Sequence, residues 1–220
     1  MKNILEEIAI TIFRSNFTKF EGWEEFEGSE IGLIPKGWKA VELGEYLSIA
    51  ETGSRPRGGI KGINVGVPSI GAESIIGLGK FDFNKTKYVP MDFYEKMNRG
   101  KLSDFDVLIY KDGGKPGQFE PHISLFGNGF PYQKMCINEH VFRARVKEPL
   151  TQSFLYFWLT SPMIMEEMRR RGTGVAIPGL NSTSLKELPL LVPDKESIKK
   201  FDIIAKPIIE KILLDSLPFE

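Results

Sequence analysis

An apolar stripe between residues 194 and 215 is the feature that most constrains how this chain can fold. The residues of the stripe recur at alternating spacings of three and four, namely Ile198, Phe201, Ala205, Ile208 and Ile212. This spacing lines one side of an α-helix, as in a coiled coil. Asp194 is a possible N-cap, and Pro207 predicts a bent or two-part helix because proline removes a backbone hydrogen bond. A chain with such a stripe must cover it with another surface.

A second amphipathic stripe lies near the N-terminus, in residues 3–20, where Ile4, Leu5, Ile8 and Ile12 share one face of a predicted helix. The acidic, glycine-containing residues 21–30 follow, so we expect a domain boundary near residue 30. Both helices need a partner. The residues expected to contact it are Ile4, Ile8, Ile12, Ile198, Phe201, Ile208 and Ile212.

Between these helices the pattern changes to short apolar runs that Gly, Pro, Asn and Asp interrupt. The runs predict strands at residues 65–70, 107–110, 122–126 and 141–146. Helical spacing is found at residues 91–98 and 151–159, and Ser161-Pro162 predicts the start of a further helix that Gly172 ends after three arginines. The sequence therefore predicts an α+β fold with a mixed, mainly antiparallel sheet, flanked by helices at its N- and C-terminal sides.

Composition limits the partners and the compartment. The 220 residues carry 29 basic and 29 acidic side chains, so contact with nucleic acid must come from local clusters or from a partner. The single cysteine, Cys136, excludes an internal disulfide and a cysteine-rich zinc site. No signal peptide is recognisable, and no apolar run approaches the roughly 20 residues that cross a bilayer. We expect a soluble, cytoplasmic protein with no membrane partner.

The residue constellations of common enzymes are missing from the sequence. Residues 112–117 lack the spacing and the Ser/Thr of a phosphate-binding loop, and no dinucleotide-binding fingerprint is present. His122 and His140 are expected on strands, without carboxylates at ligand spacing, so no metal site is predicted. Phe130-Pro131-Tyr132 lacks the polar residue and second proline of an amino-methyltransferase loop. We expect no catalytic residue and no bound cofactor, with Cys136 buried and inert; a hydrolase built on His140 or Cys136 is the alternative.

Three loop-like segments, residues 52–61, 110–118 and 172–181, carry the residue types that contact DNA. Arginine and glutamine can hydrogen-bond to base edges, and lysine contacts phosphates. The second segment turns directly after a strand, so we expect Lys111, Lys115 and Gln118 on an exposed tip. The candidate DNA-binding residues are Thr52, Ser54, Arg55, Arg57, Lys61, Lys111, Lys115, Gln118, Gln133, Lys134 and Asn181. A solvated loop, a plain tight turn and simple loop packing are the competing interpretations of the three segments.

A series of short strings extends in a fixed order over nearly the whole chain. They include Leu5-Glu6-Glu7-Ile8-Ala9, Ile34-Pro35-Lys36-Gly37-Trp38, Pro68-Ser69-Ile70-Gly71-Ala72-Glu73, Asp106-Val107-Leu108-Ile109-Tyr110-Lys111-Asp112-Gly113, His140-Val141-Phe142-Arg143, Phe154-Leu155-Tyr156-Phe157-Trp158-Leu159 and Leu188-Pro189-Leu190. Taken together, they resemble the specificity (S) subunit of type I restriction-modification systems.

The resemblance implies that residues 31–190 form one target-recognition domain. It also implies that residues 1–20 and 194–216 belong to a helical spacer that docks the modification subunits. In this family the specificity subunit reads double-stranded DNA without catalysis, and the methyltransferase (M) subunit binds AdoMet and flips the adenine. A restriction (R) subunit is a further partner that the sequence leaves open.

Family members usually carry two recognition domains, each reading half of a split site, and this chain matches one. The expected partner at the terminal helices is therefore a second copy or a different half subunit. The alternative function is a protein-binding or regulatory domain that occupies the methyltransferase without reading DNA.

Overall fold

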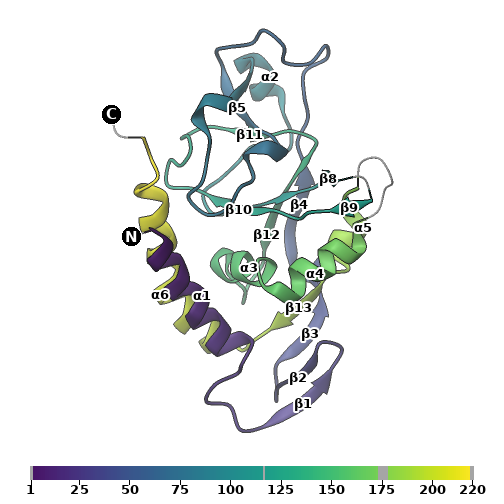
Figure 1. Cartoon of the computed structure of the whole chain (residues 1–220), viewed down its shortest axis with the longest axis vertical. Helices are drawn as coiled ribbons and strands as arrows, with labels where there is room; N and C mark the ends of the chain where they lie inside the picture. The colour runs from purple at the N-terminus through teal and green to yellow at the C-terminus, as the bar shows by residue number, and fades with distance from the viewer. Residues whose placement is uncertain (1, 116, 173–177, 219–220) are drawn as a thin grey trace.

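The computed structural model describes residues 2–115, 117–172 and 178–218. Helices α1 (Lys2–Phe17) and α6 (Lys195–Leu214) lie together on one side of the molecule, and both termini are found on that side (Figure 1). The strands are β1 (Phe26–Ser29), β2 (Gly32–Pro35), β3 (Lys39–Glu42), β4 (Leu47–Thr52), β5 (Val67–Ile70), β6 (Lys87–Val89), β7 (Asp106–Tyr110), β8 (Gly114–Lys115), β9 (Gln118–Phe119), β10 (Ile123–Phe126), β11 (Cys136–Ile137), β12 (Val141–Val146) and β13 (Pro189–Val192). The other helices are α2 (Met91–Lys96), α3 (Gln152–Leu159), α4 (Pro162–Arg171) and α5 (Ser182–Lys186), with short 3-10 turns η1 (Leu43–Glu45), η2 (Ala72–Ser74) and η3 (Phe83–Lys85).

A four-stranded antiparallel sheet in the order β10-β7-β12-β4 forms the centre of the body. A second sheet, β11-β5-β6, lies above it in Figure 1 and contains the parallel pair β11–β5. Strand β13 pairs with β3, and the hairpins β1–β2 and β8–β9 extend from the body. The predicted α+β fold, with its mixed, mainly antiparallel sheet between N- and C-terminal helices, is confirmed.

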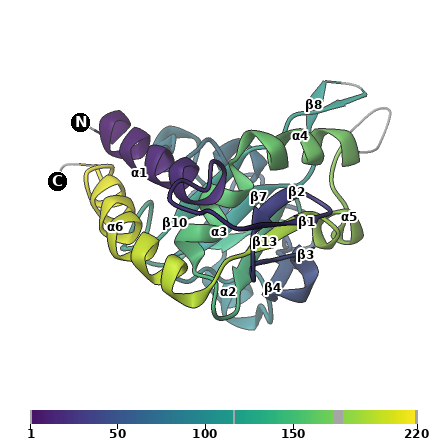
Figure 2. The ribbon, with the colours of Figure 1, turned by 90° about the horizontal axis from the view of Figure 1, so that it is seen from below.

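Helix α3 connects the central sheet to the terminal helices. Its first residue, Gln152, accepts a hydrogen bond from Val146 N at 2.8 Å and donates one to Ala144 O at 3.1 Å, which fixes α3 to β12. The other side of α3 enters an aromatic cluster with α1 and α6, formed by Phe13, Phe17, Phe154, Phe157 and Phe201. Figure 2 shows α1 and α6 on the same side of the body, with α3 inside them. This cluster makes the terminal helices part of the chain's own core.

Helix α6 begins as the sequence predicts but does not break. Asp194 Oδ1 accepts hydrogen bonds from Glu196 N and Ser197 N, both at 2.9 Å, so Asp194 is the predicted N-cap. The helix continues through Pro207 as one element to Leu214, so the two-part form is wrong, while the bend at Pro207 stays a prediction. Pro207 is exposed, and the helix tolerates the missing hydrogen bond because its apolar stripe is packed on both sides of that position.

The apolar stripe of α6 does not face a partner chain, which corrects the sequence-based assignment. Ile198, Phe201 and Ile212 are at most 1% exposed within this single chain, and Ile208 is half-buried. Their partners are α1 and α3, since an intramolecular helix pair has the same periodicity as an intermolecular one.

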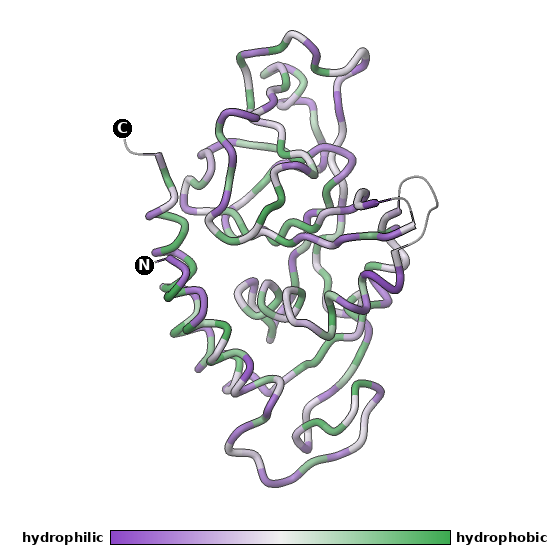
Figure 3. Tube along the Cα trace, viewed as in Figure 1, coloured by the Kyte–Doolittle hydropathy of each residue, from purple (hydrophilic) through white to green (hydrophobic). Residues whose placement is uncertain are grey.

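Helix α1 buries a different face from the one the sequence predicts. Its buried residues are Ala9, Phe13 and Phe17, whereas Ile4 is 62% exposed and Ile8 is 43% exposed; Ile12 is half-buried. Hydrophobic residues alternate with hydrophilic ones along both terminal helices in Figure 3. The face of α1 that carries Ile4 and Ile8 is therefore not covered by this chain.

Some expected boundaries shift by a few residues. The hairpin β1–β2 extends across residue 30, and β5 begins at Val67 rather than at the exposed Val65. His140 lies in the turn before β12 rather than on a strand. Whether the recognition domain begins at residue 31 stays a prediction.

Candidate nucleic-acid interface

The candidate DNA-contacting segments, far apart in sequence, are joined by backbone hydrogen bonds. Gly53 N, at the start of the first segment, donates to Asn138 O at 3.1 Å. Lys111 N donates to His140 O at 3.0 Å, and Leu180 N donates to Lys111 O at 2.8 Å. Residues 136–140 therefore contact both the first and the second segment. The second segment also contacts the third, through the hydrogen bond between Lys111 and Leu180.

The second segment forms the β8–β9 hairpin, which projects from the body in Figure 1. Lys115 pairs with Gln118 across it, and both side chains are exposed, as expected for a tip. Lys111 is not at the tip. Its side chain is only 27% exposed, and its Nζ lies 2.8 Å from Asp112 Oδ2, so the expectation of an exposed Lys111 is wrong. Pro116 lies outside the described residues.

A chain of charged contacts joins the first segment to the second. Arg55 Nε lies 3.2 Å from Glu139 Oε2, and Glu139 Oε1 lies 3.5 Å from His140 Nε2. His140 Nδ1 in turn lies 3.0 Å from Asp112 Oδ2. His140 thus has two neighbouring carboxylates, contrary to the sequence-based expectation, because the fold brings Asp112 to it across 28 positions.

The remaining residues of the first segment are more open. Thr52 ends β4 opposite Phe142, and Ser54 is half-buried beside it. Arg57 and Lys61 are exposed, and within the part of the chain that the structure describes no carboxylate pairs with either. These two cations are therefore available to an anionic ligand, whereas Arg55 is paired.

A basic patch around Tyr94, on α2, was largely missed by the sequence analysis. Lys101 Nζ and Lys134 Nζ lie 5.0 and 5.6 Å from the centre of the Tyr94 ring, within the range of cation–π contacts. Partial burial raises the pKa of Tyr94, so it is a neutral hydroxyl at physiological pH. Of this patch the sequence identified Lys134 and its exposed neighbour Gln133; an aromatic residue flanked by distant lysines has no local signature.

Asn181 has a structural role. Its Oδ1 accepts a hydrogen bond from Ser184 N at 2.8 Å and caps α5, although the residue is exposed. Residues 173–177 of the third segment lie outside the described residues. The three arginines before it, which end α4, all pair with glutamates, namely Glu120, Glu166, Glu167 and Glu187.

The thiol that an alternative hydrolase would use, Cys136, is fully buried. Burial raises the pKa of the Cys136 thiol to about 11, so Cys136 is protonated and a poor nucleophile at neutral pH. Within residues 2–115, 117–172 and 178–218, no three His, Cys, Asp or Glu residues come together as a metal site. In the same ranges, no helix is both apolar enough and long enough to span a bilayer.

The fold agrees with solved structures of one family. The HsdS subunit from Thermoanaerobacter tengcongensis matches 96% of this chain with a TM-score of 0.50 and 14% sequence identity. A second structure comes from a study of complex assembly and conformational transition of the type I R-M system. It matches 98% of this chain, also with a TM-score of 0.50 and 14% sequence identity. The type I restriction enzyme MjaIX specificity subunit of Methanocaldococcus jannaschii is 22% identical over 218 residues, or 96% of this chain. The chain has the fold of a type I specificity subunit.

The predicted resemblance to type I specificity subunits is thus confirmed in sequence and fold, although no family model matches the chain. The chain spans about half the length of the relatives it matches: 47% of the Methanocaldococcus protein, and 44% and 52% of the two solved chains. What these longer proteins bind and assemble with is therefore treated as a proposal for this chain.

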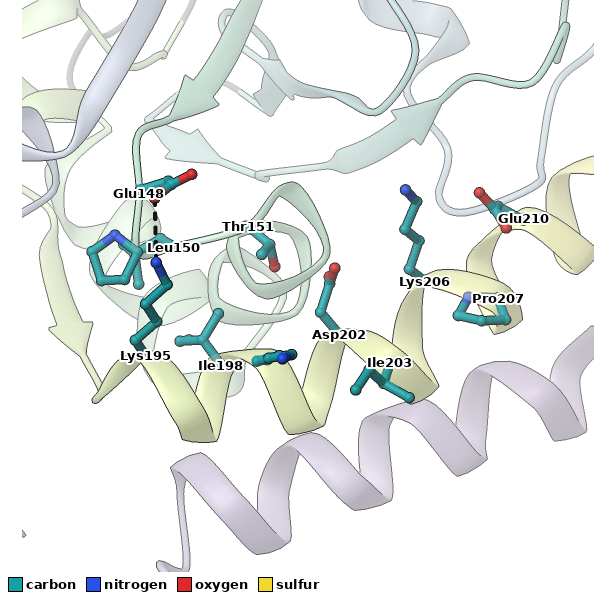
Figure 4. Close-up of a pocket in the computed structure, with 12 residues that line it drawn as sticks. Glu148, Leu150, Thr151, Lys195, Ile198, Asp202, Ile203, Lys206, Pro207 and Glu210 are labelled. Atoms are coloured by element: carbon teal, nitrogen blue, oxygen red, sulfur yellow. Dashed lines mark ion pairs between the residues drawn. The ribbon is translucent and has the colours of Figure 1, made fainter.

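Helix α6 carries a second surface, away from the β8–β9 hairpin in Figure 1. A groove of about 570 Å³ extends along α6, next to residues 148–151 (Figure 4). Asp202 points into it from α6, and Asp202 Oδ1 is buried without a hydrogen-bond partner among the described residues. Lys195 and Glu148, 3.7 Å apart, close one end. The groove adjoins Ile203, which is 65% exposed.

Proposed function

We propose that this chain is the DNA sequence-recognition subunit of a type I restriction-modification enzyme and directs a partner adenine methyltransferase to a split target site. The observation that carries the proposal is that residues 136–140 contact the first segment (residues 52–61) and the second segment (residues 110–118) through backbone hydrogen bonds from Gly53 N and Lys111 N. The first two segments expose the side chains Arg57, Lys61, Lys115 and Gln118, and the exposed Gln133 and Lys134 precede residues 136–140 in the chain. Cations and amides on loops that a sheet positions are the groups that contact phosphates and base edges.

The chain contributes recognition and no chemistry of its own in this proposal. AdoMet binding and adenine flipping belong to the methyltransferase, which also supplies most of the electrostatic attraction to DNA, since this chain has no net charge. In agreement with this, Cys136 is buried and protonated. We expect the isolated chain to bind DNA weakly.

The terminal helices supply the partner surface. We assign to it the exposed isoleucines Ile4, Ile8, Ile203 and Ile204, because apolar side chains at this exposure on two adjacent helices favour burial against another protein. The partner is a methyltransferase subunit, with a second copy or a different half subunit completing the split site and a restriction subunit as a further component. Residues 31–190 then form the recognition domain, and residues 1–20 and 194–216 the spacer.

The experiment is co-expression of the chain with the adenine methyltransferase (M) subunit of a type I system from the same organism, followed by mapping of methylated adenines on a plasmid library with randomised sites. We expect methylation at one motif that requires both proteins, and none from either alone. The double variant Arg57→Ala/Lys61→Ala should weaken methylation of all sites. It should also reduce the slope of the logarithm of the DNA-binding constant against the logarithm of salt concentration by about one unit per removed phosphate contact.

The matched control is Lys36→Ala, which removes an exposed lysine in the turn after the β1–β2 hairpin, at the other end of the molecule. It should leave methylation unchanged. A complex that assembles but methylates no defined motif would instead favour the protein-binding alternative. Methyl transfer by the purified single chain would exclude the proposal.

A further inference from the structure

Arg55 and Glu139 form an ion pair on the candidate DNA surface. They belong to different loops, and the fold places Arg55 Nε 3.2 Å from Glu139 Oε2. The Arg55 side chain is 33% exposed and that of Glu139 is 43% exposed, so a ligand can reach both. The pair thus presents cationic donors and an anionic acceptor side by side.

The geometry of the pair leaves its outward groups unused. Arginine has five N–H donors, and the contact with Glu139 lies at Nε, on the inner side of the guanidinium. Within residues 2–115, 117–172 and 178–218, no hydrogen bond occupies Nη1 or Nη2 of Arg55. Glu139 Oε2 is buried 3.2 Å from Arg55 Nε without a hydrogen bond among the described residues, so Oε1, which lies 3.5 Å from His140 Nε2, is the oxygen that a ligand can reach.

The pair is held in place by the sheet behind it. His140 N donates to Asn138 Oδ1 at 2.9 Å, and Asn138 N donates to Ile70 O at 3.0 Å, so the backbone at Glu139 is tied to β5. The His140 ring contacts Asp112 Oδ2 at 3.0 Å, and Asp112 also pairs with Lys111. These contacts hold the backbone at Glu139 and the His140 ring, whose Nε2 lies 3.5 Å from Glu139 Oε1, so the carboxylate is placed between His140 and Arg55 before any ligand arrives.

The chemical pattern of the pair matches one kind of base pair. In the major groove guanine presents two adjacent acceptors, O6 and N7, and its paired cytosine presents the N4 amino group as a donor beside O6. A guanidinium fork fits the two guanine acceptors, and a carboxylate accepts from cytosine N4. An A·T pair offers no two adjacent acceptors on one base to the fork.

We propose that Arg55 and Glu139 act as one unit that reads a G·C base pair. Arg55 Nη1 and Nη2 donate to guanine, and Glu139 Oε1 accepts from the N4 amino group of the paired cytosine. Asp112 and His140 position the unit and do not contact DNA. The inference rests on the proposed function and adds the class of base pair that is read.

The test uses the complex of the full chain with its methyltransferase, and a plasmid library with randomised sites in which methylated adenines are mapped. The variants are Arg55→Ala and Glu139→Gln. We expect both to relax the same G·C position of the wild-type motif, reducing its discrimination about tenfold or more, while the other positions stay defined. Because Arg55 and Glu139 lie on separate loops, relaxation of the same base-pair position by both variants would indicate that the two side chains act together there.

The matched control is Glu25→Gln, which breaks the exposed Lys36–Glu25 pair, with 2.7 Å between its charged atoms, at the other end of the molecule. The motif should be unchanged. His140→Gln tests whether His140 positions the pair. This variant should weaken the preference for G·C at the same position of the motif, without creating a preference for another base pair.

Three outcomes would overturn the inference. The motif could stay intact in both variants, the two variants could relax different positions, or the shared position could be A·T. A wild-type complex that methylates no defined motif would overturn the proposed function together with the inference, so the two failures are distinguishable.

Discussion

The indole nitrogen of Trp38 donates a hydrogen bond to Asp194 Oδ2 at 3.0 Å, although 156 positions separate the two residues. Asp194 is also the N-cap of α6, where its Oδ1 accepts from Glu196 N and Ser197 N. Trp38 is 4% exposed and precedes β3. One carboxylate therefore fixes the start of α6 to the beginning of the strand-rich body.

Replacement of Asp194 by Ala should lower the free energy of unfolding by about 2 kcal/mol, because the helix loses its cap and a buried indole N–H loses its acceptor. Urea unfolding followed by circular dichroism measures the change. Glu196→Ala is the control: it removes an exposed carboxylate in the first turn of α6 that pairs with Lys200, and should change stability by about 0.5 kcal/mol or less. Equal effects of the two variants would show that the shared hydrogen bonds do not stabilise the fold.

The same carboxylate predicts a pH dependence. Burial alone would raise the pKa of Asp194, but hydrogen bonds from Ser197, Trp38 and backbone N–H groups outweigh burial and lower it below its ordinary value of 3.8. A folded pKa below the unfolded one gives stability that is present above the unfolded pKa and is lost as the pH falls through the folded pKa. The difference in unfolding free energy between wild type and Asp194→Asn should therefore be constant from pH 7 to about 5. It should shrink below pH 4, and a constant difference down to pH 2.5 would contradict the assignment.

Local features of the fold could be predicted from sequence because they depend on neighbouring residues. The N-cap at Asp194 and the strand β12 at Val141–Val146 follow from capping chemistry and from a short apolar run. The hydrogen bond from Trp38 could not be predicted, since no local rule pairs residues so far apart. Helix α1 offers two apolar faces, and periodicity alone does not show that Phe13 and Phe17 are inside while Ile4 is outside.

The candidate site was predicted by residue type but not by arrangement. Arg55 and Lys115 are recognisable as cations on glycine-rich loops. Glu139 cannot be recognised as a site residue from the sequence, because its contact with Arg55 depends on the pairing of β4 with β12. Tyr94 was missed because the lysines around its ring come from other segments.

Asp106 should be among the residues most sensitive to substitution. It is fully buried, and its carboxylate contacts Arg143 Nε at 2.6 Å and Arg145 Nη1 at 2.5 Å. Asp106→Ala leaves two partly buried guanidinium groups without this partner and should reduce stability by about 3–5 kcal/mol. Asp92→Ala removes an exposed ion pair with Lys96 and should cost about 1 kcal/mol or less. Similar midpoints of denaturant unfolding for the two variants would contradict this difference.

The exposed isoleucines should affect association rather than folding. Ile8→Glu and Ile203→Glu change side chains that are 43% and 65% exposed, so each should alter the unfolding free energy by less than about 0.5 kcal/mol. Both should weaken co-purification with the methyltransferase or with a second half subunit, as measured by size-exclusion chromatography with light scattering. Phe201→Ala is the contrasting variant: it opens a cavity in the shared aromatic core and should destabilise the chain by about 3–5 kcal/mol. Normal assembly of both glutamate variants would show that Ile8 and Ile203 do not belong to the partner surface.

Gly53 tests whether the close backbone approach at the base of the first loop is needed. A Cβ at this position would lie 1.6 Å from Ile137 O, a backbone atom that is held by the pairing of β11 with β5. Gly53→Ala should therefore push the loop that carries Arg55 away from residues 136–140 and reduce stability by about 1–3 kcal/mol. Gly28→Ala, in the β1–β2 hairpin with no atom within 4 Å of its added Cβ, should be nearly neutral. If Gly53→Ala keeps both stability and the wild-type methylation motif, the position of this loop is not set by its contact with Ile137, and the fixed geometry of the Arg55–Glu139 pair must have another source.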